Sequence, residues 1–293
     1  MTLIILDEKK YAEQILRTDP VDFSKPYQTL SIIARYYYHM CGCDGEKLTG
    51  KLHCFMELHY PRYNPLDWTN SIESCAKQAA KYPICQCSGV WITQKELDIM
   101  KEINDKVLER LAFTLLCLAK YHNFKNKNNQ NWVNNPDSEI YRLACITTNS
   151  YDKDIRFFKL KEMGLIDFAK KIDNLSMKVL FVHDDSEKKL CITDFRKLGY
   201  EWRLYKGEDY IRCSCCNILV RKTSVNKKYC KDCVKKNPYY TPVGVKTILC
   251  QDCGKTFNAD ASSRECRCEA CKTSHRKELQ RMKMRRYRNK TAV

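Results

Sequence analysis

Eight cysteines in the last third of the chain occur as four C-x2-C pairs, a spacing that suits metal binding. A two-residue gap lets one tight turn present two thiolates to the same ion, and tetrahedral zinc takes four such ligands. The pairs form two groups of four: Cys213, Cys216, Cys230 and Cys233, followed by Cys250, Cys253, Cys268 and Cys271. We therefore expect two structural Zn2+ ions, one in each group.

The two cysteine groups are spaced as a repeat. Cys213 and Cys250 are 37 residues apart, and so are Cys216 and Cys253. One small module duplicated in tandem would give this spacing. Each module has too few apolar residues to fold alone, so zinc binding worth about 10–16 kcal/mol per site would supply its stability.

The choice of ligands within each group stays open at this point. Cys215 competes with Cys216, and Cys266 competes with Cys268; we favour Cys216 and Cys268 because they complete a C-x2-C pair. An iron–sulfur cluster or redox-active cysteine pairs are the alternatives to zinc. A redox pair normally begins a helix in a βαβ unit, and the sequence has no such pattern here.

Composition limits the class of protein. The chain has 293 residues and 19 cysteines, with only 9 glycines and 8 prolines, which argues against a disordered or fibrous class. It has no run of 18 apolar residues, and its first residues lack the pattern of a signal peptide. We therefore expect a cytoplasmic protein without a membrane partner, whose cysteines are free thiols or metal ligands rather than disulfides.

Positive charge gathers on the cysteine-rich part of the chain. The net charge is +17 overall and +14 from residue 201 onward, which leaves +3 for residues 1–200. Such a surplus on small zinc modules points to a polyanion, most simply DNA or RNA. A solvated basic tail without a fixed partner is the alternative.

A basic helix is predicted after the last cysteine, over residues 274–293. Its cations can lie along a phosphate backbone, where they supply affinity but little sequence choice. The candidate nucleic-acid contacts in this helix are Arg276, Lys277, Arg281, Arg285, Arg286 and Arg288.

The middle of the chain has the element order of a winged-helix domain. Thr93 and Glu96 form a capping box at the start of one long helix, which runs through the apolar stretch Leu111–Leu118. A short helix after Pro136 and a third helix over residues 150–163 follow, and two strands over residues 165–170 and 176–182 would form the wing. In such domains the third helix enters a groove of DNA and the wing contacts the backbone. The candidate contacts are therefore Lys153, Arg156 and Lys159 on the helix and Lys170, Lys171 and Lys178 on or near the wing.

These segments predict an α+β multidomain protein. The expected parts are a helical N-terminal domain (1–92, with a short hairpin between residues 84 and 92), a winged-helix domain (93–185), a connector (186–210), a first zinc module (211–237), a second zinc module (247–273) and a basic helix or tail (274–293). In the connector, we expect Phe195, Leu198, Tyr200 and Trp202 to pack on the winged-helix domain.

No catalytic motif stands out, so catalysis has no support from the sequence. Gly45–Leu52 resembles a phosphate-binding P-loop, but no strand precedes it and Leu52 replaces the hydroxyl that would bind magnesium. A loose group of histidines and cysteines between His39 and His59 could hold a third metal, although Cys54 is more simply a core residue. No small-molecule substrate is evident.

Several segments resemble a family of uncharacterised zinc-ribbon proteins carried by prophages and integrative elements of Gram-positive bacteria. They are Leu30–Tyr37, Tyr60–Pro65, Lys81–Pro83, Leu111–Leu116, Ile192–Arg196 and Ile211–Cys213 with the C-x2-C pairs that follow. The middle segment is similar in pattern to phage replisome organisers and plasmid replication initiators. The resemblance implies DNA binding in replication, transcription or maintenance of a mobile element.

Three functions compete on this evidence. The first is a zinc-dependent DNA-binding protein of a mobile element that acts without catalysis. The second is a phage-encoded inhibitor that binds a host nucleic-acid enzyme through its zinc modules. The third is an RNA-binding protein in which aromatic residues of the zinc modules stack on bases.

Overall fold

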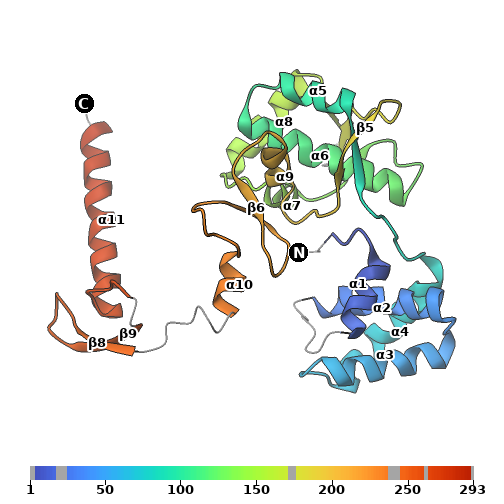
Figure 1. The fold of residues 1–293 in the computed structure, drawn as a ribbon, viewed down its shortest axis with the longest axis horizontal. Coiled ribbons are helices and arrows are strands. Elements are labelled where there is room, and N and C mark those ends of the chain that lie inside the picture. The colour runs from blue at the N-terminus through green and yellow to red at the C-terminus, as the bar shows by residue number, and fades with distance from the viewer. Residues whose placement is uncertain (1–3, 18–24, 171–175, 237–244, 261–262, 292–293) are drawn as a thin grey trace. The chain divides into compact units, whose positions relative to one another are not determined.

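The computed structural model describes residues 4–17, 25–170, 176–236, 245–260 and 263–291. The chain forms two compact units, Met1–Lys228 and Tyr229–Val293, which are described separately (Figure 1). It is a mixed protein of helices and short antiparallel sheets. Among the described helices, none combines the length and apolar character that a bilayer crossing requires.

Four helices at the N-terminus surround a small core of their own (Figure 1). Asn64 caps the last of them by accepting a hydrogen bond from the backbone N–H of Leu66, with Pro65 at the first helical position. Asparagine as the cap and proline at the first position are residue types that favour a helix start, and Ile72, Cys75 and Ala79 are buried as a helical period requires. The helices are α1 (Glu8–Arg17), α2 (Pro26–Cys41), α3 (Gly45–His59) and α4 (Pro65–Lys81).

The predicted long helix after Thr93 is two helices, α5 (Gln94–Glu102) and α6 (Lys106–Lys125). The capping box of Thr93 and Glu96 is present. The single helix is wrong because Asn104 adopts a left-handed conformation (φ 54°) and the Asp105 side chain caps a new helix, accepting from the N–H groups of Val107 and Leu108. The predicted apolar stretch of α6 is fully buried, so α6 forms the centre of the second core.

Two further helices and a three-stranded sheet pack around α6. The sheet has the order β2-β4-β3 and is antiparallel throughout. Asn149 caps α8, and Gly164, with a left-handed backbone (φ 72°), follows its end, which agrees with the predicted helix over residues 150–163. The elements are β2 (Trp132–Val133), α7 (Asp137–Leu143), α8 (Ser150–Glu162), β3 (Ile166–Phe168) and β4 (Met177–Val179).

The expected hairpin between residues 84 and 92 is wrong. Its second half is strand β1 (Val90–Thr93), which pairs with β5 (Lys188–Ile192) from a distant part of the chain. Helix α9 (Leu198–Tyr205) follows β5 and contributes Trp202 to the core. Phe195 and Leu198 are also buried there, which confirms their predicted packing on the middle segment.

Trp202 is fully buried beside α6 and has a polar partner. Its indole N–H donates to a carboxylate oxygen of Glu109 at 2.7 Å, and its ring lies 5.3 Å from that of Phe113, centroid to centroid. A buried indole N–H without an acceptor would cost free energy, so Glu109 stabilises this position.

The remaining elements are short. The first unit contains the ribbon β6 (Tyr210–Arg212) and β7 (Leu219–Arg221). The second contains helix α10 (Lys231–Lys236), the ribbon β8 (Val245–Leu249) and β9 (Thr256–Asp260), and the long helix α11 (Glu269–Thr291).

Gly199 provides a test of the packing between α7 and α9. A Cβ at this position would lie 1.9 Å from the backbone oxygen of Ala144, whereas a Cβ at Gly50 in α3 would meet nothing within 4 Å. We expect G199A to lower the free energy of unfolding by about 2–3 kcal/mol, because the backbone of α7 must move. The matched control G50A should raise it by about 0.4–1 kcal/mol through helix propensity. Urea unfolding followed by circular dichroism measures both, and equal stabilities would contradict the close approach.

Candidate metal centres

The structure gathers the two predicted cysteine groups into two compact clusters of sulfur atoms. The Sγ atoms within each cluster all lie within 4.8 Å of one another. Four sulfurs at the Zn–S bond length of about 2.3 Å would be about 3.8 Å apart in a tetrahedron. Cys253 and Cys268 are separated by 3.7 Å between their sulfurs. Each cluster could therefore hold one metal ion, consistent with two structural ions.

The clustered cysteines are not disulfides. All 19 cysteines of the chain are free thiols in the structure. A disulfide would bring two sulfurs to about 2.05 Å, far below the separation between Cys253 and Cys268. Four soft donors that converge without bonding to one another fit a thiophilic ion such as zinc.

Each cluster begins with the same tight turn. In the first, the N–H of Cys213 donates to Ile218 at 2.9 Å and that of Asn217 donates back to Cys213 at 2.8 Å. Asn217 has a left-handed backbone (φ 58°). Turns of this kind bring the first two sulfurs of a C-x2-C pair to one side.

The second cluster repeats this turn 37 residues later. Cys250 donates to Lys255 and Gly254 donates to Cys250, both at 2.9 Å, and Gly254 is left-handed (φ 66°). A glycine or asparagine is needed at this position because other residues adopt a positive φ at a cost. The tandem repeat predicted from the spacing therefore extends to the backbone hydrogen bonds.

Backbone N–H groups point at cluster sulfurs. Cys233 donates to the sulfur of Cys230 at 3.3 Å, and Cys268 donates to the sulfur of Cys250 at 3.3 Å. The bond from Cys268, followed by one from Cys253, lowers the pKa of Cys250 to about 6. Donors aimed at sulfur favour the thiolate, which is the form that binds metal.

Cys215 and Cys266, the two competing cysteines, lie outside the clusters. Both are exposed, and the converging sets contain Cys216 and Cys268 instead. The geometry thus agrees with the ligand set chosen by C-x2-C spacing.

The first ribbon is fixed to α9 by contacts that sequence reasoning missed. Arg196 donates to the backbone oxygen of Cys216 at 2.9 Å and pairs with Asp194 at 2.7 Å. Arg212 pairs with Glu201 at 2.9 Å, and burial raises the pKa of Glu201. The bonds from Arg196 to Cys216 and from Arg212 to Glu201 have no spacing signal, because their partners lie 20 and 11 residues apart.

The cations of α8 and the wing that we predicted to contact nucleic acid differ in their exposure to solvent. Lys159 and Lys170 are exposed, whereas Arg156 is half-buried, and the Lys153 ammonium lies 5.6 Å from the centroid of the Tyr141 ring. Lys178 is also half-buried, in β4, and Lys171 lies outside the described residues.

The cations of α11 are more exposed to solvent. Arg276, Lys277, Arg281 and Arg285 are exposed. Arg286 and Arg288 continue the helix, and their side chains lie outside what the structure describes. Within the described residues, Lys272 is the one cation of α11 with an ion-pair partner.

The weaker sequence patterns have structural explanations. Gly45 begins helix α3 and Leu52 is fully buried in it, so the segment is not a phosphate-binding loop after a strand. His39 bonds to the backbone oxygens of Ala79 and Tyr82. Over the described part of the chain, the two four-cysteine clusters are the groups that could hold a metal.

Comparison of the chain with protein-family models, curated proteins and solved structures finds no match. The proposed function therefore rests on the cysteine clusters and the exposed cations of this chain.

Metal content provides a direct test of the ligand set. We expect two zinc ions per chain by elemental analysis and one in C216S or C268S, because three thiolates with an added water bind more weakly than four. The matched controls C215S and C266S should keep two. A loss of metal in either control, with full metal in C216S and C268S, would reverse the ligand assignment.

Proposed function

We propose that this chain is a zinc-dependent nucleic-acid-binding protein, most simply a DNA-binding protein, that acts without catalysis. The observation that carries the proposal is helix α11, which follows directly from the second cysteine cluster. It has nine lysines and arginines and two glutamates in 23 residues, a net charge of +7. A helix with this density of cations matches the charge of a phosphate backbone.

Helix α11 differs from a helix that packs on a core, because its described apolar side chains are exposed. Leu279, Met282 and Met284 are all 42–51% exposed, so these three side chains do not hold the helix against the rest of the second unit. Its cations repel one another, and phosphates would relieve this repulsion while releasing counterions.

The second cysteine cluster would fix the start of α11. Cys268 immediately precedes the helix and Cys271 lies in its first turn. A metal ion bound there would tie this end of the helix to the ribbon β8–β9, because Cys250 and Cys253 lie in the turn between the two strands. The proposed role of zinc is therefore to hold a basic helix in position rather than to take part in chemistry.

We further propose that α6, α7, α8 and the sheet β2-β4-β3 form a winged-helix domain. Support comes from the order helix, strand, helix, helix, strand, strand, and from the last strand pairing between the other two. In this interpretation α8 is the helix that approaches a groove, with Lys159 exposed on it and Lys170 at the wing.

A protein partner is the second candidate for α8. Tyr151 and Phe158 are 73% and 58% exposed and lie seven residues apart, which puts them on one face of the helix. Asp154 is exposed between them and would repel phosphates. This surface of α8 supports the hypothesis of an interaction protein, such as a phage factor bound to a host nucleic-acid enzyme. The basic helix α11 supports that hypothesis less.

The biological setting follows from the resemblance alone. Proteins of prophages and integrative elements that bind DNA act in replication, transcription or element maintenance, and we propose one of these roles for the chain. RNA remains the alternative nucleic acid, because phosphate contacts from α11 do not distinguish the two.

Salt dependence tests the role of α11. We expect duplex affinity to fall steeply with salt, and R276Q/K277Q/R281Q/R285Q to flatten the slope of log K against log salt by about 2–4, since each lost phosphate contact contributes about 0.9. Fluorescence anisotropy on duplex DNA, single-stranded DNA and RNA measures this.

The matched control for that experiment removes four cations elsewhere. Lys47, Lys81, Lys95 and Lys106 are all exposed and lie outside the proposed interface. K47Q/K81Q/K95Q/K106Q has the same net charge as the α11 variant and should keep the wild-type slope. Equal slopes in the two variants would reject a specific role for α11.

A second pair of variants separates the two uses of α8. If this helix contacts DNA, K159Q/K170Q should weaken duplex binding and flatten the slope of log K against log salt by about one or more, because two phosphate contacts are lost. Y151A/F158A should have a smaller effect. If it contacts a protein, Y151A/F158A should abolish capture of that partner and leave duplex affinity unchanged. Anisotropy and a pull-down with purified host complexes measure both.

A further inference from the structure

The sheet β2-β4-β3 has a buried face and an outer face. Val133, Met177 and Val179 belong to the core around α6. Side chains alternate along a strand, so Trp132 and Lys178, which oppose each other across β2 and β4, point away from that core. A hollow of about 360 Å3 lies at this outer face, and its lining consists of Asn126, Asn128, Asn129, Trp132, Asn134 and Ser176.

The loop between α6 and β2 forms one wall of the hollow and is held by its own amides. The side chain of Asn129 donates to Asn123 at 3.0 Å and to the backbone oxygen of Trp132 at 2.8 Å. The side-chain oxygen of Asn126 accepts from the backbone N–H of Asn128 at 3.0 Å. This wall is therefore formed before a ligand arrives, which lowers the entropy cost of binding.

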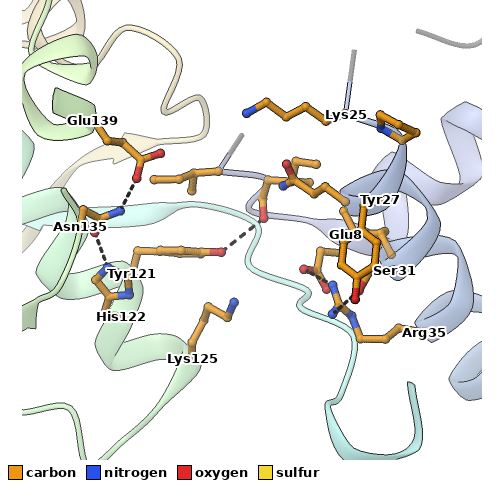
Figure 2. A pocket seen from close by; sticks show the side chains of 15 residues that line it. Glu8, Lys25, Tyr27, Ser31, Arg35, Tyr121, His122, Lys125, Asn135 and Glu139 are labelled. Carbon is orange, nitrogen blue, oxygen red and sulfur yellow. Dashed lines mark hydrogen bonds and ion pairs between the residues drawn. The ribbon is translucent and has the colours of Figure 1, made fainter. Parts of the chain in front are cut away.

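Asn134 reaches the hollow from the segment between β2 and α7. Its neighbour Asn135 lines a different cavity, which Figure 2 shows. There the side-chain oxygen of Asn135 bonds to a ring nitrogen of His122 at 2.7 Å, and its amide group donates to Glu139 at 2.9 Å. These two bonds fix the backbone next to Asn134.

Asn128 and Asn134 have unused hydrogen-bonding groups at the hollow. Both are exposed, and neither side chain bonds to another residue within the part of the chain that the structure describes. A side-chain amide offers two donor hydrogens and one acceptor oxygen. Such amides match the donors and acceptors on the edge of a nucleobase.

The charge around the hollow is positive. None of its six lining residues is acidic. Lys127 is exposed in the loop, and Lys178 is half-buried beside Trp132. Asp167, which opposes Lys178 on β3, pairs instead with Lys161 at 3.0 Å. An aromatic ring with cations beside it is the arrangement that binds single strands, because a base stacks on the ring and phosphates approach the cations.

We propose that the outer face of this sheet binds an unpaired base of a single-stranded nucleic acid. The base stacks on the Trp132 ring, and the side-chain amides of Asn128 and Asn134 bond to its edge. The ammonium groups of Lys127 and Lys178 approach the neighbouring phosphates. The inference rests on the proposed function in that the ligand is a nucleic acid. It adds a preference for unpaired bases, which phosphate contacts from α11 do not provide.

Tryptophan fluorescence of the zinc-loaded full chain, titrated with oligo(dT), tests the stacking. We expect oligo(dT) to quench the emission and W132F to lose this quench, because phenylalanine can stack but does not emit with the indole. The matched control W91F should keep it, since Trp91 is 43% exposed in β1 and does not line the hollow. A quench that persists in W132F would overturn the proposal.

Anisotropy on oligo(dT), an abasic strand of the same length and a duplex measures the contribution of the base. Oligo(dT) should bind at least about fivefold more tightly than the abasic strand, the lower end of the effect of one stacked base. N128A/N134A should lower the ratio of single-strand to duplex affinity at least about fivefold. The control N70A/Q78A removes two exposed amides from α4 and should retain the wild-type ratio.

Two results of the anisotropy experiment contradict the site. Equal affinities for oligo(dT) and the abasic strand would show that phosphates alone are bound, and an unchanged ratio in N128A/N134A would exclude the amides. Melting curves of all variants verify that they are folded.

Failure of this site and failure of the proposed function give different results. If α11 does not bind nucleic acid, R276Q/K277Q/R281Q/R285Q keeps the salt slope of duplex binding, while W132F still loses the quench by oligo(dT). If the sheet does not bind bases, the α11 variant still flattens that slope, while W132F keeps the quench. Oligo(U) tested beside oligo(dT) identifies the strand: a quench by either supports the unpaired base, and the stronger quencher is the preferred nucleic acid.

Discussion

The convergence of four cysteine sulfurs, twice, is the constraint on which the C-terminal third of this protein depends. After α9, the buried apolar side chains among the described residues are Cys213, Leu219, Cys230 and Cys250. Three of the four are members of the sulfur clusters. Two-stranded ribbons with so little buried surface are marginal in water, and metal–thiolate bonds at the two clusters would replace the missing core.

The N-terminal two thirds are stabilised in a different way. Two apolar cores, one around α2 and α4 and one around α6, bury long aliphatic runs. Charged groups inside them are paired: Glu96 accepts from Lys120 at 2.7 Å and also caps the backbone at Thr93 and His183. These bonds join α5 to β1, to α6 and to the segment after β4.

This division has a functional consequence. A module held by metal needs few apolar residues, so most of its surface can carry charge without loss of stability. The chain concentrates its positive charge on these modules and its buried apolar residues in the two N-terminal cores. The ribbon β6–β7 is held next to the second core by two bonds. Arg212 in β6 pairs with Glu201 in α9, and Arg196, in the segment before α9, donates to the backbone oxygen of Cys216 between the two strands.

The sequence by itself determined the features that depend on neighbouring residues. C-x2-C spacing predicted which eight sulfurs converge, and the cap residues Asn64 and Thr93 predicted helix starts, because a turn or a cap involves residues only two or three positions apart. Only the tertiary structure decided the contacts between segments that lie far apart in the sequence. Strand β1 pairs with β5 almost 100 residues later, and Arg196 contacts the backbone of Cys216. A cavity in the first unit likewise takes residues from the segments 4–35 and 121–139, which lie far apart in the sequence. Hydrophobic periodicity and residue spacing do not predict such contacts, because the contacts contribute free energy only once the chain has folded.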